Sequence, residues 1–216
     1  MKKVALIVAG GKGARMKADL PKQFLLLNGT PILIHTLKQF SHFEEIVLVL
    51  PSAQFDYWQE LCKTHNFSQK HTLISGGETR FHSVKNGLEK IGKKSVVAIH
   101  DGVRPLVSTA LINSLIAETK QGIGVIPIVP VKDSIRKIEG ENSTYLDRSS
   151  LYKVQTPQCF LGADIQKAYT QDFYDTFTDD ASVFEANGGQ ITTILGEERN
   201  IKITTEQDLI IAATLL

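Results

Sequence analysis

The sequence predicts an α/β fold in which a mostly parallel sheet carries helices on both faces. The first observation is that short apolar runs alternate along the chain with longer segments of helical periodicity. The second is that glycine-rich or polar loops follow three of these runs, at residues 10–13, 76–80 and 101–104. In such sheets, loops at the carboxyl ends of the strands meet at one edge, where ligands bind. We therefore expect a Rossmann-like sheet with a ligand site at that edge.

Composition bounds the class of protein. The chain has 216 residues, of which 42% are hydrophobic and 22% are charged, as is usual for a folded globular protein. This length suits a single domain over residues 1–216. The formal net charge is +1, so no global field draws the chain to nucleic acid or to a membrane. Any site for an anion must therefore be local.

Apolar patterning and cysteine usage indicate the compartment. No apolar run approaches the length of a membrane span, and the first residues lead into a strand rather than into a secretory signal. Cys62 and Cys159 supply no disulfide framework and are expected to be idle thiols in a reducing compartment. We therefore expect a cytoplasmic protein.

The first part of the chain alternates strands and helices. Short apolar runs bounded by turn residues predict strands, and a periodicity near 3.6 predicts helices. Strands are expected at residues 4–8, 46–50, 72–74, 96–100 and 124–129. Helices are expected at residues 30–40, 54–65, 81–91 and 108–119. Thr30 is expected to cap the first helix with Pro31 as its first residue, and Ser108 to cap the last.

Residues 132–153 differ from the rest of the chain. Two short segments flank the turn Gly140-Glu141-Asn142-Ser143, a pattern typical of a β-hairpin. The hairpin is too polar to form a core of its own, and an isolated hairpin is marginal in water. We therefore expect a protruding arm that lies on the domain or reaches a partner subunit.

After the arm, the chain returns to the core. Thr178 or Asp179 is expected to cap a helix. A strand is expected at residues 190–195, a short strand at residues 200–204, and a final helix from Thr205. The sequence contains no internal repeat and no linker, which predicts one domain with one arm.

The glycine-rich segment after the first strand indicates a phosphate site. Gly10, Gly11 and Gly13 lie within four residues, and glycine lets backbone N–H groups approach a ligand closely. Cations follow with almost no acid among them: Lys12, Arg15, Lys17 and Lys22. A strand, a glycine turn and a cationic tail suit a nucleoside triphosphate, and a plain tight turn is the alternative.

Two better-known phosphate motifs do not fit this segment. A Walker loop, G-x-x-x-x-G-K-[ST], is not found in the sequence. The dinucleotide fingerprint fails because Met16 stands where its last glycine belongs. The pattern A-G-G-x-G-x-R-M, followed shortly by P-K-Q, resembles instead the signature of sugar-phosphate nucleotidylyltransferases.

Longer motifs cover nearly the full length of the chain, in this order: AGGKGARM, PKQF, GGETRFHSV, HDGVRP, PVKDS, DRSSLYKVQTPQ, TDDAS and NIKIT. Together they resemble the 2-C-methyl-D-erythritol 4-phosphate cytidylyltransferases of the non-mevalonate isoprenoid pathway. The resemblance implies transfer of CMP from CTP to 2-C-methyl-D-erythritol 4-phosphate, with release of pyrophosphate. The ribitol-5-phosphate cytidylyltransferases resemble the chain almost as well.

The implied reaction explains the residue types. The nucleophile is a phosphate monoester oxygen, which is already anionic at neutral pH and needs no general base. The obstacle is the approach of one anion to another, which fixed cations and in-line positioning overcome. The resemblance implies that Arg15 and Lys22 are catalytic groups on the triphosphate. It implies that Arg148 and Lys202 are catalytic groups that grip the acceptor phosphate.

The resemblance also implies contacts to the nucleotide from residues that follow the strands: Ala9, Gly10, Gly11, Gly13, Gly77, Glu78, Ser83, Asp101 and Gly102. Asp101 is in addition the expected ligand of Mg²⁺, which takes one or two carboxylates besides phosphates. The family often has Asp in place of Glu78, and alanines in place of Gly102 and Val103. Glu78 could instead be an acid at a helix N-terminus, and Asp101 a turn residue that bonds its own backbone.

Contacts to the acceptor are implied for five residues: Arg104, Ser134, Arg148, Thr156 and Lys202. Ser134 keeps the hydroxyl of the threonine that is common in the family. Family members are dimers with clasped arms, so residues 132–153 are expected to form a homodimer in which Ser134 and Arg148 could serve the neighbouring site. A solvated surface charge is the alternative for Arg148 and for Lys22.

Other polar residues have simpler interpretations. His100 is expected to be structural, and the histidines show no spacing that would indicate zinc. Asp179 and Asp180 could be a metal pair, but helix capping is the preferred interpretation.

Two other functions stay open from the sequence. D-ribitol 5-phosphate could be the acceptor, because a methyl group adds only about 1–3 kcal/mol of discrimination. The ribitol-5-phosphate cytidylyltransferases more often carry an extended loop where residues 17–20 stand here, so the resemblance implies that this short segment favours methylerythritol. A non-catalytic nucleotide-binding module is the third hypothesis, and the joint presence of four cations argues against it: Arg15, Lys22, Arg148 and Lys202.

Overall fold

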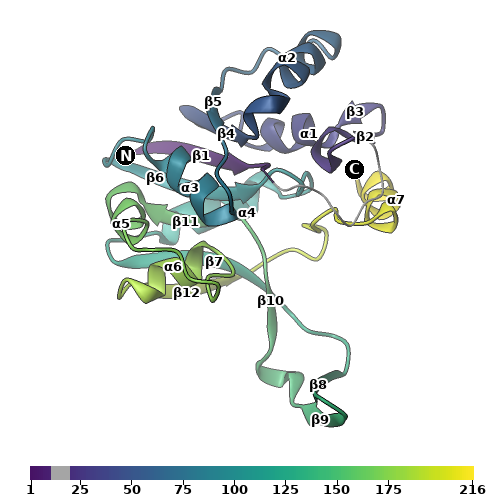
Figure 1. Ribbon diagram of the computed structural model, residues 1–216, viewed down its shortest axis with the longest axis vertical. Coiled ribbons are helices and arrows are strands. Elements are labelled where there is room, and N and C mark those ends of the chain that lie inside the picture. The colour runs from purple at the N-terminus through teal and green to yellow at the C-terminus, as the bar shows by residue number, and fades with distance from the viewer. Residues whose placement is uncertain (11–19) are drawn as a thin grey trace.

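The computed structural model describes residues 1–10 and 20–216 of the chain (Figure 1). Its centre is a sheet of eight strands in the order β10-β7-β11-β6-β1-β4-β5, with β12 paired to β7. The strands are β1 (Lys2–Val8), β4 (Glu45–Leu50), β5 (Thr72–Ser75), β6 (Ser95–Asp101), β7 (Ile123–Pro130), β10 (Tyr152–Val154), β11 (Gln158–Leu161) and β12 (Gln190–Leu195).

Most pairings in this sheet are parallel, as predicted. β1 pairs in parallel with both β4 and β6, and β4 pairs in parallel with β5. β12 also runs parallel to β7. Because parallel strands end at the same edge, the loops after β1, β5 and β6 come together there. The predicted α/β fold is confirmed.

The sequence did not predict β11 as a strand or the change of direction that it introduces. β11 runs antiparallel to both of its neighbours, β6 and β7, and β10 runs antiparallel to β7. β11 has four residues, too few for a periodicity to be recognised. The two strands on its sides decide its conformation, so this part of the sheet follows from long-range pairing.

Helices cover both faces of the sheet, also as predicted. On β1, Ala5 and Ile7 belong to one core cluster, whereas Val4 and Leu6 belong to another, as the alternation of side chains along a strand requires. The first cluster includes residues of α1 (Ile32–Gln39), α2 (Phe55–Thr64) and α4 (Thr109–Glu118). The second includes residues of α3 (Arg80–Leu88), α5 (Gly162–Ala168) and α6 (Asp180–Ala186), or of the turns that follow them. A third, smaller cluster includes Ala212 of the last helix, α7 (Glu206–Leu215).

Two of the predicted helix caps, and the predicted start of the last helix, are confirmed. The hydroxyl of Ser108 accepts a hydrogen bond from the backbone N–H of Leu111 at 3.0 Å, and α4 starts at the next residue. Asp179 and Thr205 cap α6 and α7, each in a capping box. Such caps satisfy backbone N–H groups that the first turn of a helix leaves unpaired, so short polar side chains mark helix starts in the sequence.

The predicted cap of the first helix is wrong. α1 begins at Ile32, and Pro31 is its N-cap residue, without a hydrogen bond from a capping side chain. Thr30 and Pro31 instead form β3 (Thr30–Pro31), which pairs with β2 (Leu26–Leu27) around the turn Asn28-Gly29. Both turn residues have positive φ, 47° and 79°, which Asn and Gly tolerate best.

The predicted short strand at residues 200–204 is also wrong. The alternation of Ile201 and Ile203 suggests a strand, but these residues have no regular secondary structure. The backbone N–H of Ile203 donates to the carbonyl of Val103 at 2.9 Å, and Ile203 is buried in the third cluster. The alternation therefore reflects the burial of one side of this irregular segment, which crosses the end of β6.

The predicted arm is a hairpin that stands away from the sheet (Figure 1). It consists of β8 (Ile135–Glu139) and β9 (Asn142–Leu146), in antiparallel register. The loop is shorter than expected, because Asn142 and Ser143 belong to β9 and only Gly140 and Glu141 connect the strands. Nearly all arm residues are exposed. The assignment of residues 1–216 to one domain stays a prediction.

Within residues 1–10 and 20–216, no helix has both the length and the apolar character that crossing a membrane requires.

Candidate active site

A pocket of about 520 Å³ lies at the carboxyl edge of the parallel strands. Its wall combines residues at the ends of β1 and β5 with five charged residues from four segments: Lys22, Glu78, Arg80, Asp101 and Lys202. A smaller pocket of about 270 Å³ shares Arg80, Asp101 and Lys202 with the first. The three shared residues therefore mark the boundary between two adjoining pockets.

Ser83 shapes the first pocket from α3. Its Oγ accepts a hydrogen bond from the backbone N–H of Gly77 at 3.1 Å. A Cβ atom on Gly10 or Gly76 would lie only 3.2 Å from this Oγ. Glycine at these positions lets the backbone after β1 and the backbone after β5 approach the same hydroxyl. The two backbone segments therefore lie close together along one wall of the pocket. Their backbone polar groups could bind a flat, polar ring.

A chain of side-chain amides holds the segment that carries Lys22. Gln23 is buried in the short helix Lys22–Phe24, and its Nε2 donates to the carbonyl of Ala9 at 3.0 Å. The same Nε2 donates to Oε1 of Gln54 at 2.9 Å. The backbone carbonyl can only accept, so it determines the orientation of both amides. Lys22 is thereby tied to the end of β1 and lines the pocket.

Asp101, the last residue of β6, is the centre of charge in the site. Arg104 Nε and Lys202 Nζ both lie 3.1 Å from its Oδ2. Arg80 Nε lies 3.7 Å from its Oδ1. Burial alone would raise the pKa of Asp101, but the charges of Lys202, Arg80 and Arg104 outweigh burial and hold the pKa well below its usual range. Asp101 is therefore ionised, and three cations surround one carboxylate.

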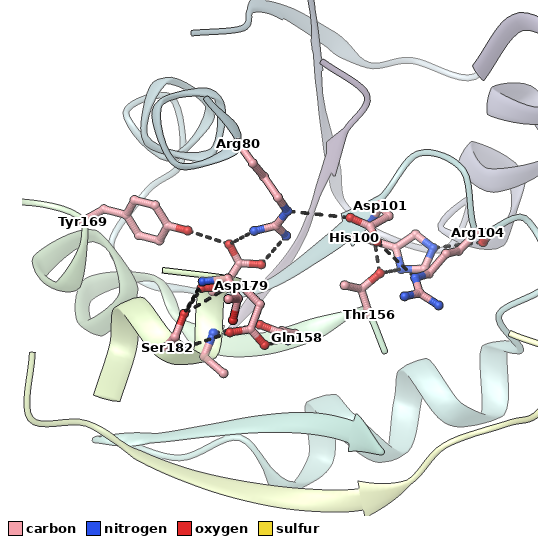
Figure 2. A network of polar contacts seen from close by, with 12 residues as sticks. Arg80, His100, Asp101, Arg104, Thr156, Gln158, Tyr169, Asp179 and Ser182 are labelled. Atoms are coloured by element: carbon pink, nitrogen blue, oxygen red, sulfur yellow. Dashed lines mark hydrogen bonds and ion pairs between the residues drawn. The ribbon is translucent and has the colours of Figure 1, made fainter. Parts of the chain in front are cut away.

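The hydroxyl of Thr156 connects Asp101 to a neutral histidine, His100. Thr156 Oγ1 accepts from the backbone N–H of Asp101 at 3.0 Å and lies 3.0 Å from His100 Nδ1 (Figure 2). His100 Nε2 lies 3.0 Å from the carbonyl of Arg104, which can only accept, so Nε2 carries the proton. Nδ1 then accepts from the hydroxyl of Thr156. Burial lowers the pKa of His100 to about 4, which fits this neutral form. The expectation that His100 is structural is consistent with these contacts.

Arg80 extends from the start of α3 between two carboxylates (Figure 2). Its Nη1 and Nη2 donate to the two carboxylate oxygens of Asp180 at 2.8 and 2.6 Å. Tyr169 Oη donates to Asp180 Oδ1 at 2.6 Å. Burial alone would lower the pKa of Arg80, but the charge of Asp180 raises it above its ordinary value. The guanidinium is therefore a permanent cation on the wall of both pockets.

The structure brings most of the predicted nucleotide and acceptor residues together. Those that line the first pocket are Ala9, Gly10, Lys22, Gly77, Glu78, Ser83, Asp101 and Lys202. Arg104 and Thr156 line the smaller pocket. Gly102 is buried directly after Asp101, and its N–H donates to the carbonyl of Val8. Glu78 lies before the N-cap residue Thr79, so it is outside the first turn of α3. The roles assigned to all these residues stay predictions.

Other predicted residues do not join this group. Ser134 and Arg148 belong to the arm, and no described residue between 132 and 152 lines either pocket. The guanidinium of Arg148 donates instead to the backbone carbonyl of Lys132. Gly11, Gly13 and Arg15 lie outside the described residues, as do the cation Lys17 and most of the short segment of residues 17–20.

The sequence indicates no role for Arg80 or Tyr169, and it does not indicate the ion pair of Asp180. Arg80 belongs to the motif GGETRFHSV, in a loop that was already expected at the ligand edge, so its position was a usable signal. Asp180 carried no such signal, because nothing local indicates that α6 meets α3. Asp179 caps α6, which agrees with the preferred interpretation, whereas Asp180 makes an ion pair that was not foreseen.

The donor set fits one magnesium ion delivered with a nucleotide. The closest approaches of Arg104 and Lys202 to Asp101 are to Oδ2, at 3.1 Å each, whereas Arg80 lies 3.7 Å from Oδ1, so Oδ1 is the oxygen that a metal ion could approach. Mg²⁺ needs only one or two carboxylates when phosphates supply the other ligands. The described residues contain no cluster of three or more His, Cys, Asp or Glu that could hold a metal alone. Phosphate oxygens would therefore have to complete the coordination.

The two cysteines take no part in the site. Cys62 and Cys159 are free thiols. Burial raises the pKa of Cys62 to about 11, and it raises that of Cys159 further. Both are therefore protonated and unreactive at neutral pH, as expected.

Comparison with known proteins identifies the family. The family model for 2-C-methyl-D-erythritol 4-phosphate cytidylyltransferase matches residues 3–216. A relative of that name from Bacteroides fragilis is 48% identical, with 100% of both chains covered, and one from Porphyromonas gingivalis is 47% identical, with 100% of this chain and 98% of the relative covered. The crystal structure of the Francisella tularensis protein of that name has a TM-score of 0.84 at 30% identity, with both chains fully covered. The chain belongs to the 2-C-methyl-D-erythritol 4-phosphate cytidylyltransferase family.

Proposed function

We propose that the protein transfers CMP from CTP to 2-C-methyl-D-erythritol 4-phosphate, a step of non-mevalonate isoprenoid precursor synthesis. The products are 4-diphosphocytidyl-2-C-methyl-D-erythritol and pyrophosphate. The observation that carries the proposal is the group of three cations on Asp101, at the boundary of two adjoining pockets. One pocket would hold CTP and the other the acceptor phosphate, so that the cations face the point where two anions meet.

The chemistry needs charge and position rather than proton transfer. An oxygen of the acceptor phosphate attacks the α-phosphorus of CTP, and the bond from that phosphorus to the bridging oxygen of pyrophosphate breaks. The attacking oxygen carries a negative charge at neutral pH, so no base has to remove a proton. Lys22 and Lys202 line the pocket with Arg80, and fixed cations there stabilise the charge that develops on the α-phosphoryl oxygens.

The first pocket has the features that a cytidine moiety needs. Backbone groups of Ala9, Gly10 and Gly77 line it, together with the hydroxyl of Ser83. Fixed backbone donors and acceptors can discriminate among bases, because a wrong base leaves buried polar groups unpaired. We assign the base and ribose to this wall and the triphosphate to the side with Lys22 and Lys202.

Magnesium is part of the proposal. When bound, Mg²⁺ supplies positive charge to the triphosphate oxygens. Asp101 would hold it through Oδ1, while Arg104 and Lys202 keep the other carboxylate oxygen and so orient the side chain. The low pKa of Asp101 keeps this ligand ionised.

We propose further that the protein acts as a homodimer through its arm. The arm exposes apolar side chains that its own domain does not cover, namely Ile138, Tyr145, Leu146 and Tyr152, and the adjacent Val154 is exposed as well. A hairpin with such side chains gains stability by packing on a second copy. In that arrangement, Ser134 and Arg148 would serve the site of the neighbouring subunit.

A cytoplasmic location also stays a prediction.

The decisive experiment measures pyrophosphate release with CTP and Mg²⁺ while two acceptors are supplied in parallel. We expect 2-C-methyl-D-erythritol 4-phosphate to exceed D-ribitol 5-phosphate by about a hundredfold or more in kcat/KM, roughly 3 kcal/mol in barrier. A preference for D-ribitol 5-phosphate would change the acceptor and leave the catalytic assignments intact. Release with neither acceptor would overturn the proposal, and calorimetric titration with CTP would then show whether the pocket binds a nucleotide without catalysis.

A further inference from the structure

Arg80 is shared by two carboxylates of different character. Asp180 has no solvent-exposed side-chain surface and takes two hydrogen bonds from Arg80, at 2.8 and 2.6 Å. Asp101 is 9% exposed and is approached by Arg80 Nε at 3.7 Å only. The guanidinium therefore forms two hydrogen bonds with Asp180, whereas it only lies near Asp101. The side chain of Arg80 is 30% exposed, so it also faces the pockets.

The contacts of Asp180 explain why it retains Arg80. Both of its oxygens are used, since Tyr169 Oη also donates to Oδ1 at 2.6 Å. The ring of Tyr169 is held in turn by stacking on Phe81, with the ring centroids 4.8 Å apart. A fully buried carboxylate is costly unless it is paired, which favours the two-bonded ion pair over any exposed alternative. Capping of α6 depends on Asp179 and Ser182, not on Asp180.

We propose that Asp180 and Tyr169 are positioning residues of the transfer reaction, which act by holding Arg80 at the boundary of the two pockets and away from a two-bonded contact with Asp101. This inference rests on the proposed function. Without Asp180, Asp101 is the carboxylate with which Arg80 still forms an ion pair, at 3.7 Å. Arg80 would then pair with Asp101 through Oδ1, because Arg104 and Lys202 make their closest contacts with Oδ2. The cation would leave the pocket wall, and Asp101 would lose its accessible oxygen.

Four variants test this inference by steady-state kinetics: Asp180→Asn, Tyr169→Phe, Arg80→Met and the double variant Arg80→Met/Asp180→Asn. We expect Asp180→Asn to lower kcat by about tenfold to a hundredfold, the scale of a misplaced group, with KM for CTP within threefold of the wild type. Tyr169→Phe removes one hydroxyl and should lower kcat by about fivefold. Once Arg80 is absent, loss of Asp180 should have no further effect, so the double variant should have the same kcat as Arg80→Met.

Ser182→Ala is the matched control. It removes the capping-box hydroxyl of α6 but leaves Arg80, Asp180 and Tyr169 in place. We expect it to lower the melting temperature without a change in kcat. If Ser182→Ala lowers kcat as much as Asp180→Asn does, or if the effects of Arg80→Met and Asp180→Asn multiply, Asp180 acts by supporting α6 and the inference is overturned.

A measurement without turnover separates this inference from the proposed function. The ¹⁵N resonance of the Arg80 side-chain Nε–H, assigned by its loss in Arg80→Met, should move in Asp180→Asn and, by less, in Tyr169→Phe. An unchanged resonance in both would overturn the inference. If the wild type released no pyrophosphate with any acceptor, the proposed function would fail while this spectrum still decided whether Asp180 holds Arg80. Should Asp180→Asn not fold, Tyr169→Phe decides by the same two readouts.

Discussion

The Nζ atom of Lys202 lies 3.1 Å from Oδ2 of Asp101, although the two residues come from segments far apart in the chain. Asp101 ends a central strand, whereas Lys202 belongs to a segment without regular secondary structure. That segment is held because the backbone N–H of Ile203 donates to the carbonyl of Val103 at 2.9 Å. The position of this cation therefore depends on an irregular segment tied to the loop after β6.

Lys202→Met is expected to lower kcat by about a hundredfold to a thousandfold, as loss of one preorganised charge at a reacting group does. Pyrophosphate release under saturating substrates measures the effect. Lys2→Met is the matched control, because Lys2 forms an exposed ion pair with Glu45 at the opposite end of β1. A Lys202→Met enzyme within threefold of the wild type would exclude Lys202 from catalysis.

Asp101→Asn should separate nucleotide binding from turnover. The variant removes the carboxylate that three cations share and the ligand proposed for Mg²⁺, so we expect kcat to fall by at least about a hundredfold. In the presence of a chelator, CTP should bind at least as tightly as to the wild type, because the cations then face only the nucleotide. Isothermal titration with CTP and EDTA measures this affinity. If Asp101→Asn bound CTP more weakly than the wild type in EDTA, this expectation would be wrong. The main effect of Asp101 would then be to orient the three cations, not to offset their charge.

Thr156→Val should destabilise the fold. It leaves the backbone N–H of Asp101 without its acceptor and His100 Nδ1 without its donor, both in a buried place. An unpaired buried polar group costs about 1–3 kcal/mol, which urea unfolding can resolve. Thr156→Ser keeps the hydroxyl and is expected to retain most of the stability. Equal stability of the Val and Ser variants would contradict this account of the network.

His71 should make stability depend on pH in the weakly acidic range. The indole N–H of Trp58 donates to His71 Nε2 at 2.9 Å, and Nδ1 lies 2.8 Å from the carbonyl of Gln69, so the ring is neutral. Burial lowers the pKa of His71. The unfolded chain therefore binds a proton at a higher pH than the native protein does. The contribution of the neutral His71 ring to the free energy of unfolding is complete above a pH of about 6.5, and it decreases as the pH falls below that value.

Urea unfolding at pH 7.5 and at pH 5.5 tests the prediction for His71 against His71→Gln. The advantage of the wild type over the variant should be larger at pH 7.5. His42→Gln, at an exposed histidine, is the control. An advantage that grew on acidification would mean that the protonated ring is favoured in the folded state.

Exchange of the arm can be tested by complementation. Arg148→Ala and Lys202→Met should each be nearly inactive. If Arg148 serves the partner's site, each mixed dimer holds one intact site, and a re-equilibrated equal mixture should recover about a quarter of the wild-type activity. Sedimentation should show a dimer for both variants. No recovery from demonstrably mixed dimers would place Arg148 in the site of its own subunit.

Features that obey local rules can be predicted from the sequence. The apolar runs that became β1, β4 and β6 are almost fully buried, because a central parallel strand needs apolar side chains on both faces. The caps at Ser108, Asp179 and Thr205 are visible because a helix start leaves N–H groups that only nearby side chains can satisfy. Loops after parallel strands meet at one edge in any such sheet, so the pocket could be located before its walls were known.

The charges that meet in that pocket, by contrast, could not be predicted, because they depend on how distant segments pack together. Arg80 finds Asp180 because α3 and α6 pack on the same face of the sheet, and Lys202 finds Asp101 because an irregular segment crosses the end of β6. The antiparallel insertion of β11 between β6 and β7 belongs to the same class of feature. Each depends on contacts between residues distant in sequence, whose energies come from burial and pairing and leave no periodic pattern in the chain.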